Sequence, residues 1–220
     1  GLRRLGAPGA AHLSAREMDG YGLAFSYMVS ARLWTLSRRQ PSWSRLYQDP
    51  MMRDALAGIH AAARTVDLEL AYFAAHEPLC AALEAAQRRG VRVRVLTNSA
   101  ESNDLPFSTY TAYLGMRRML EAGAEVRVRR GRGRTLHPKY FVADGSRVGF
   151  GSHNLDYYSV RYCCELNLQV RDERLGAALS EFFESGWNEA TAVDLEGQVK
   201  PFLEGQQVLR LFDRVFRDFQ

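Results

Sequence analysis

The stretch that most restricts the fold of this chain covers residues 136–154 and reads LHPKYFVADGSRVGFGSHN. Two runs of largely apolar residues flank the pair Asp144-Gly145, which is typical of a tight hairpin turn. Side chains in a strand alternate between faces, so His137 and Lys139 would point the same way. The sequence therefore predicts an antiparallel hairpin that carries polar side chains on one face.

The length of the loop at this turn decides which polar groups meet. A two-residue loop places His137 opposite Ser152, or opposite Asn154 if the turn shifts by one residue. A three-residue loop would instead place His153 opposite His137. We favour the two-residue loop because it groups an imidazole, an ammonium and two neutral hydrogen-bonding groups, and we expect His153 to face the other side.

Such a grouping suits the cleavage of a phosphodiester. A neutral imidazole at His137 can attack phosphorus and form a covalent phosphohistidine. The ammonium of Lys139 and the polar groups of Ser152 and Asn154 can hold the nonbridging oxygens, where negative charge develops. No CxxC or HExxH motif accompanies these residues, so no metal or other cofactor is expected.

The spacing His137-x-Lys139-x4-Asp144, followed by Gly151-Ser152-x-Asn154, resembles the HKD motif of the phospholipase D superfamily. Three stretches resemble, more narrowly, the C-terminal catalytic half of bacterial cardiolipin synthases and their phosphatidyltransferase relatives: LAYFAAHEPLCAALEAAQRRGVRVRVLTNSAESND, YTAYLGMRRMLEAGAEV and GSHNLDYYSVRYCCELNLQV. The likeness covers about residues 50–190. One departure is Pro138, which removes a backbone donor and suggests a local irregularity.

The resemblance implies roles for residues outside the motif. Glu165, on the next expected strand, would orient the nucleophile and complete the catalytic set. The loops after the first two strands would form the substrate rim, together with one tyrosine beyond the motif; these substrate-binding candidates are Tyr72, Phe73, Thr97, Asn98 and Tyr157. Core packing is an equal alternative for Tyr72 and Phe73. His76 is expected to begin a helix, and Asp144 to be structural because it lies at the turn.

The chemistry needs two histidines, whereas the chain carries a single HxK motif. Either a second HKD half lies upstream, or two identical chains form a homodimer that builds one site. Because the chain begins with Gly1 rather than Met, we expect a processed product or an excised fragment.

Three functions are consistent with these features. The first is transfer or hydrolysis at the phosphodiester of an anionic phospholipid, by an enzyme in peripheral contact with the cytoplasmic face of the bacterial inner membrane. The second is a homodimeric phosphodiesterase or nuclease acting on nucleic acid, and the third is a noncatalytic half that binds anionic lipid or a partner. The basic run at residues 126–134, VRVRRGRGR, is either a solvated loop or an attractor of an anionic substrate.

The order of expected elements indicates an α/β fold, with a mixed β-sheet flanked by helices on both faces. We expect an N-terminal helical extension or linker (1–48), a phospholipase D-like domain (49–190) and a C-terminal helical segment (191–220). Strands are expected at 66–73, 91–97, 125–129, 136–143, 147–152 and 164–170. Helices are expected at 21–36, 49–63, 77–89, 110–122, 173–185 and 201–219. Hydrophobic content of 46% is enough for a sizeable core, and three cysteines give no disulfide framework.

Overall fold

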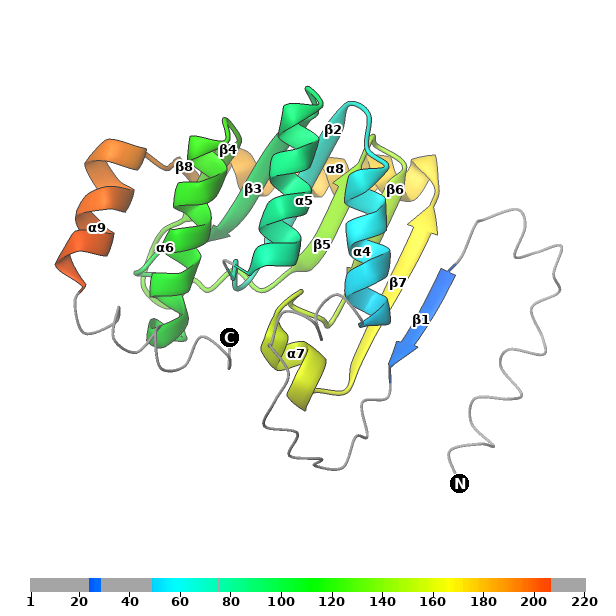
Figure 1. The fold of residues 1–220 in the computed structure, drawn as a ribbon, viewed down its shortest axis with the longest axis horizontal. Helices are drawn as coiled ribbons and strands as arrows, with labels where there is room; N and C mark the ends of the chain where they lie inside the picture. Colours follow the sequence, from blue (N-terminus) through cyan, green and yellow to red (C-terminus); the bar gives the residue numbers. More distant parts are fainter. Residues whose placement is uncertain (1–23, 29–48, 75, 207–220) are drawn as a thin grey trace, which may run out of the picture.

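A computed structural model describes residues 24–28, 49–74 and 76–206 (Figure 1). Its strands are β1 (Ala24–Met28), β2 (Thr65–Leu70), β3 (Arg92–Asn98), β4 (Glu125–Arg129), β5 (Lys139–Ala143), β6 (Arg147–Gly151), β7 (Glu165–Arg171) and β8 (Thr191–Ala192). Within the described residues they form one sheet in the order β1-β7-β6-β5-β2-β3-β4-β8. β2, β3 and β4 run parallel, and the other neighbouring strands are antiparallel.

The helices are α4 (Pro50–His60), α5 (Glu77–Arg88), α6 (Pro106–Glu121), α7 (Tyr157–Tyr162), α8 (Glu173–Glu189) and α9 (Lys200–Gly205), with a π-helical turn, η1 (Leu195–Val199), before α9. α4, α5 and α6 lie on one face of the sheet, and α8 lies on the opposite face (Figure 1). The prediction of a mixed sheet covered on both faces is therefore confirmed.

Side-chain caps explain where three of these helices begin. The Asp49 carboxylate accepts a hydrogen bond from the backbone N–H of Met52 at 2.8 Å, and Pro50 occupies the first turn, where its missing N–H costs nothing. The ring of His76 caps α5, as expected for a helix-entry residue. Asp172 caps α8 in the same way. Each cap satisfies an N–H that the helix itself leaves without a partner.

Two apolar clusters hold the layers together. On the α4–α6 side the sheet contributes buried residues such as Leu68, Val93 and Phe141. On the α8 side the cluster comprises Leu96, Leu136, Tyr140, Val142, Val148, Phe183 and Trp187. Both faces of the central strands are thus buried, which makes the sheet a firm platform for the loops at its edges.

The structure corrects several expected elements. Residues 24–28, part of the expected helix 21–36, form strand β1 and pair with β7; the rest of that expected helix lies outside the described residues. Of the expected helix 201–219, the structure describes residues up to 206, and α9 ends at Gly205. The short helix α7 was not predicted. Strands β1 and β8 lie outside the predicted 49–190 domain, yet they pair within the same sheet.

Within the described ranges, no helix is both long enough and apolar enough to cross a bilayer.

Candidate active site

β2 and β6 end, and β5 and β7 begin, at the same end of the sheet (Figure 1). The candidate residues other than Asp144 lie in or next to the elements that meet there. The register fixes this meeting point, because Leu70 at the end of β2 pairs with Lys139 at the start of β5. Likewise Gly151 at the end of β6 pairs with Asn167 near the start of β7. Segments that are far apart in sequence therefore present their polar side chains at the same place.

His137 lies two residues before the start of β5, and its side chain is exposed. The Lys139 Nζ lies 3.2 Å from His137 Nδ1, 3.1 Å from its Nε2 and 2.9 Å from its carbonyl oxygen. The ring of Tyr72 meets the imidazole edge-on, with 6.2 Å between ring centroids and 81° between ring planes. The imidazole thus keeps an open side toward solvent while an ammonium stands beside both of its nitrogens.

Burial lowers the pKa of Lys139, because a partly buried ammonium loses hydration. Three carboxylates oppose this effect by favouring the charged form, in decreasing order Glu165, Asp156 and Asp104. Burial and the three carboxylates thus act in opposite directions on the Lys139 ammonium. Because this ammonium is only partly hydrated, it can interact with an incoming anion.

The preferred hairpin register was wrong. β5 and β6 pair with Ala143 opposite Arg147, which leaves the three-residue loop of Asp144, Gly145 and Ser146. The ladder ends before His153, so that residue does not come to lie beside the imidazole of His137. After Gly151 the chain leaves β6 and leads into α7.

Beyond β6, the side chain of Ser152 turns toward β7. Its Oγ donates a short hydrogen bond to the carboxylate of Glu165 and accepts the N–H of Leu166 at 3.0 Å. Asn154 is held by its backbone N–H, which donates to Ser159 Oγ at 3.3 Å. The Oδ1 of Asn154 is buried and has no hydrogen-bond partner among the described residues. The contacts of Glu165 thus run to Ser152, and its role in orienting His137 stays a prediction.

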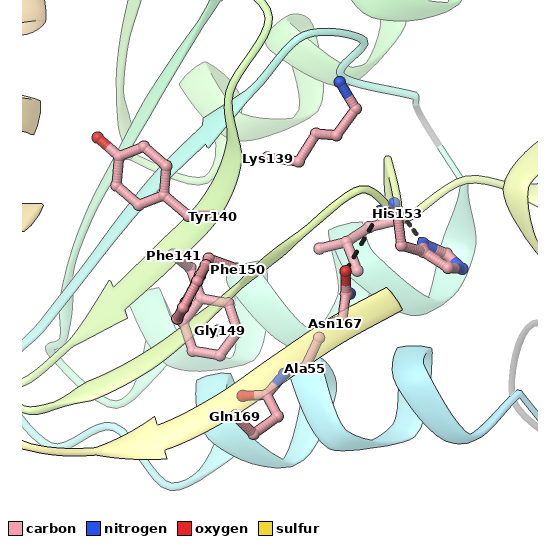
Figure 2. A pocket seen from close by; sticks show the side chains of 10 residues that line it. Ala55, Lys139, Tyr140, Phe141, Gly149, Phe150, His153, Asn167 and Gln169 are labelled. Carbon is pink, nitrogen blue, oxygen red and sulfur yellow. Dashed lines mark hydrogen bonds between the residues drawn. The ribbon is translucent and has the colours of Figure 1, made fainter. Parts of the chain in front are cut away.

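His153 faces the α4 side of the sheet and is 2% exposed, whereas the Lys139 ammonium points away from it (Figure 2). Its backbone N–H donates to Asn167 Oδ1 at 3.2 Å, and its Nδ1 accepts the N–H of Leu155 at 2.8 Å. The proton of the neutral ring therefore sits on Nε2, 3.8 Å from an oxygen of Asp49. Burial lowers the pKa of His153 to about 4, which keeps the ring neutral and makes it part of the framework.

The part of the chain that forms this site matches a known protein family. A family model described as "Cardiolipin synthase, PLD-like domain" matches residues 56–187. The chain belongs to this phospholipase D-like family. The resemblance recognised in the HKD motif is therefore confirmed.

Curated relatives agree with this membership. Cardiolipin synthase A of Pseudomonas entomophila is 32% identical over 143 residues, which is 64% of this chain and 29% of that protein. A cardiolipin synthase of Clostridium perfringens is 28% identical over 157 residues, which is 70% of this chain and 32% of that protein. The chain thus spans about a third of the length of the cardiolipin synthases that it matches.

Solved structures share the fold at low sequence identity. Nuc of Salmonella typhimurium, a phospholipase D family member, has a TM-score of 0.59 at 16% identity and covers 79% of this chain and 98% of its own. NucT from Helicobacter pylori has a TM-score of 0.58 at 16% identity, covering 79% and 99%. The phosphatidylserine synthase of Haemophilus influenzae has a TM-score of 0.55 at 18% identity, covering 74% and 42%. The phospholipase D fold is thus shared across most of the chain.

Of the five candidate substrate-binding residues, Tyr72 alone is partly exposed. Its hydroxyl donates to Asp104 at 2.8 Å, and burial together with this carboxylate raises the pKa of Tyr72 to about 12. The other four candidates are buried, namely Phe73, Thr97, Asn98 and Tyr157. Their positions correct the expectation that all five line the substrate rim, because a substrate cannot reach side chains inside the protein.

Asp144 lies at the opposite end of β5 from His137. Its carboxylate accepts three backbone N–H groups, from Ala63 at 2.9 Å, Arg64 at 2.7 Å and Thr65 at 3.0 Å. Partial burial favours the protonated form, but these donors outweigh it and hold the pKa of Asp144 below its ordinary value. In this position the motif aspartate ties the hairpin to the loop between α4 and β2.

The five arginines of the basic run divide into two groups. Arg127 donates to the carbonyl oxygen of Trp187 at 2.8 Å and stacks over its ring, and Arg129 lies 3.8 Å from Glu189. The others are exposed in the loop that follows β4, on the approach to His137; they are Arg130, Arg132 and Arg134. These exposed arginines form a basic surface next to the site, and an anion can reach it.

Sequence reasoning missed two carboxylates near the site. Asp104 stands beside Tyr72 but belongs to no motif, so only its place after a strand could have drawn attention to it. Asp49 caps α4, and nothing in the sequence indicated that it would also face His153.

Proposed function

We propose that this chain catalyses transfer or hydrolysis at the phosphodiester of an anionic phospholipid, through a covalent phosphohistidine on His137. The observation that carries the proposal is an exposed imidazole with the Lys139 ammonium about one hydrogen bond away, in a domain of the cardiolipin synthase-like family. An imidazole can attack phosphorus only if it is accessible, and an adjacent cation stabilises the charge that develops on the phosphoryl oxygens.

The reaction has two balanced steps. In the first, a ring nitrogen of His137 bonds to phosphorus, the bond from phosphorus to the alcohol oxygen breaks, and a second histidine gives that oxygen a proton. In the second step, the second histidine takes a proton from water or a lipid alcohol. The oxygen of that molecule attacks phosphorus, and the N–P bond breaks. Lys139, Ser152 and Asn154 hold the phosphoryl group throughout, and Glu165 orients the nucleophile.

In the proposed reaction the second histidine comes from a partner of this site. The described part of the chain contains three other histidines: His76 and His153 are buried, and His60 lies at the far end of α4. We propose that a second HKD half lying upstream, or a second copy of the chain in a homodimer, supplies the imidazole. The molar mass in solution, measured with phosphatidylglycerol turnover on one sample, separates these cases. A dimer with turnover supports the homodimer, and an inactive monomer supports the upstream half.

An anionic lipid suits the charge of the site edge. The exposed loop arginines add positive charge next to the site, and the chain has a formal net charge of +4. Attraction of this kind concentrates an anionic substrate and favours peripheral contact with an anionic membrane surface. We therefore propose that the protein works in peripheral contact with the cytoplasmic face of the bacterial inner membrane.

The same exposed arginines favour a second candidate, a homodimeric phosphodiesterase acting on nucleic acid, because phosphate backbones attract the same loop. Turnover of phosphatidylglycerol vesicles compared with single-stranded DNA separates the two. His137→Ala should abolish turnover while His60→Ala, which changes an exposed histidine far from the site, leaves it intact. Turnover that survives His137→Ala refutes the catalytic assignment, and binding of anionic vesicles without any turnover favours the noncatalytic reading.

A further inference from the structure

The segment that leads into His137 leaves the sheet in an unusual way. In β2 and β5 the hydrogen-bonded pairs involve every second residue, and the last such pair is Ala71 with Pro138. The N–H of Ala71 donates to the carbonyl oxygen of Pro138 at 3.0 Å. An antiparallel pair of this type normally exchanges two hydrogen bonds, but Pro138 has no N–H to return. The carbonyl oxygen of Ala71 therefore needs another donor.

Asn98, at the end of β3, supplies that donor. Its Nδ2 lies 2.8 Å from the carbonyl oxygen of Ala71 and 2.8 Å from that of Leu136. Its Oδ1 accepts the N–H of Leu136 at 2.9 Å and lies 3.0 Å from the hydroxyl of Ser102. Both amide hydrogens and one acceptor position are therefore used inside the protein, and the Ser102 hydroxyl also lies 2.8 Å from the carbonyl oxygen of Arg129.

We propose that Asn98 is a positioning residue for His137: its amide replaces the donor that Pro138 lacks and clamps the backbone of Leu136, one residue before the nucleophile. This role rests on the proposed function, because it presumes that His137 reacts. It adds a coupling between Asn98 and Pro138, which are 40 positions apart: Asn98 donates to the carbonyl oxygen of Ala71 that lies opposite Pro138.

Two contacts and the exposure of the ring explain why this clamp positions the imidazole. The side chain of Leu136 is buried in the α8-side cluster, so the residue is held by its side chain as well as by its backbone. Thr135 Oγ1 donates to the carbonyl oxygen of Ser102 at 2.8 Å, which ties the same segment to the loop after β3. The ring of His137 itself is exposed and has only Lys139 and the edge of Tyr72 beside it among the described residues. The position of the His137 ring is therefore set by the backbone that precedes it.

A role for Asn98 in binding substrate directly is incompatible with its surroundings. The residue is 2% exposed, and both hydrogens of its amide are donated to backbone carbonyl oxygens inside the protein. Loss of its amide should consequently slow the chemical step without weakening the binding of substrate, since a nucleophile displaced by about 1 Å can lose about 100-fold in rate.

A double-mutant cycle of Asn98→Ala and Pro138→Ala tests the coupling. Asn98→Ala should speed hydrogen exchange at the Leu136 amide at least tenfold and lower kcat at least tenfold, with KM within twofold. Pro138→Ala restores a donor to Ala71, so the loss of kcat and of folding stability caused by Asn98→Ala should be at least threefold smaller in that background. The matched control is Asn103→Ala: this loop amide donates to Ser108 at 3.1 Å and makes no contact with Leu136.

The outcomes are distinguishable from failure of the proposed function. Exchange and folding stability are measured without substrate, so they decide the positioning role even if the chain turns over no lipid. Equal effects of Asn98→Ala in both backgrounds, or a raised KM with intact kcat, overturn the proposal. If Asn98→Ala does not fold, Ser102→Ala removes one contact of the same amide and should speed exchange at Leu136 by a smaller factor. Unchanged exchange in that variant overturns the proposal.

Discussion

Replacement of Asp144 by asparagine separates the structural from the chemical reading of the motif aspartate. The asparagine side chain would keep one oxygen, which can still accept the N–H groups of Arg64 and Thr65, but its amide nitrogen would face the N–H of Ala63. The backbone at Asp144 has φ of 54°, a left-handed conformation that asparagine tolerates, so no strain is added.

The expected loss can be worked out from these contacts. One hydrogen bond to a charged acceptor disappears, worth about 1.5–3 kcal/mol, and two others lose their charge assistance. Because the carboxylate is partly exposed, screening reduces these values, and we expect a loss of about 2 kcal/mol in the free energy of unfolding. For a chain of this size that corresponds to a fall in Tm of about 4–8 °C.

Urea denaturation at neutral pH measures this change, with Asp172→Asn as the matched control. Asp172 caps α8 by accepting one N–H at 2.8 Å, and asparagine caps a helix about as well as aspartate, so the control should change stability by less than about 0.5 kcal/mol. The reasoning is refuted if Asp144→Asn is as stable as the control. It is also refuted if the variant is fully folded and loses turnover, because the carboxylate would then take part in the chemistry.

Two further substitutions test the framework of the site. Burial lowers the pKa of His76 to about 4, so below pH 6.5 the unfolded chain binds a proton that the folded chain refuses, and stability should fall by about 1.4 kcal/mol per pH unit for this residue down to pH 4. His76→Asn keeps a capping side chain and should remove that part of the slope in urea titrations at pH 7, 6 and 5, whereas His60→Asn should not; equal slopes in both variants would contradict the assignment. A Cβ added at Gly151 would overlap the side-chain oxygen of Asn167 and the backbone of β7, so Gly151→Ala should lose at least about 2 kcal/mol. Gly205→Ala meets no atom within 4 Å and serves as its control; similar midpoints for the two glycine variants would show that the close approach is not needed.

Local signals predicted most of the helices and strands. The expected helices 49–63 and 77–89 became α4 and α5, because caps such as Asp49 with Pro50 and stops such as Gly90 depend only on neighbouring residues. The apolar runs that became β2 and β3 were readable for the same reason. The strand β1 was not, because its pairing with β7 joins residues about 140 positions apart and no local pattern encodes that contact.

The hairpin register failed for a tertiary reason. Asp144-Gly145 was read as a two-residue turn, and both residues do adopt positive φ. The carboxylate of Asp144, however, binds the backbone at Ala63 to Thr65, and Ser146 joins the loop. Turn chemistry alone cannot foresee an anchor about 80 residues away.

The candidate residues lie at or near the ends of the strands, as expected, but the sequence did not indicate the direction of their side chains. Asn98 was expected to contact substrate, whereas its amide is used by the carbonyl oxygen of Ala71 and by the backbone of Leu136. That arrangement depends on the N–H that Pro138 lacks. The sequence indicated a local irregularity at Pro138 but not this consequence. The sequence indicates which residue types lie at the ends of the strands. Tertiary packing determines which of their side chains point outward.

The most direct test of the central claim is to trap the intermediate on His137. Brief incubation with phosphatidylglycerol followed by mass spectrometry of the denatured chain should reveal a phosphatidyl group on the peptide that contains His137, formed with release of glycerol. The adduct should be acid-labile and absent from His137→Ala. Turnover accompanied by an adduct on another residue, or turnover that persists in His137→Ala, would contradict the account.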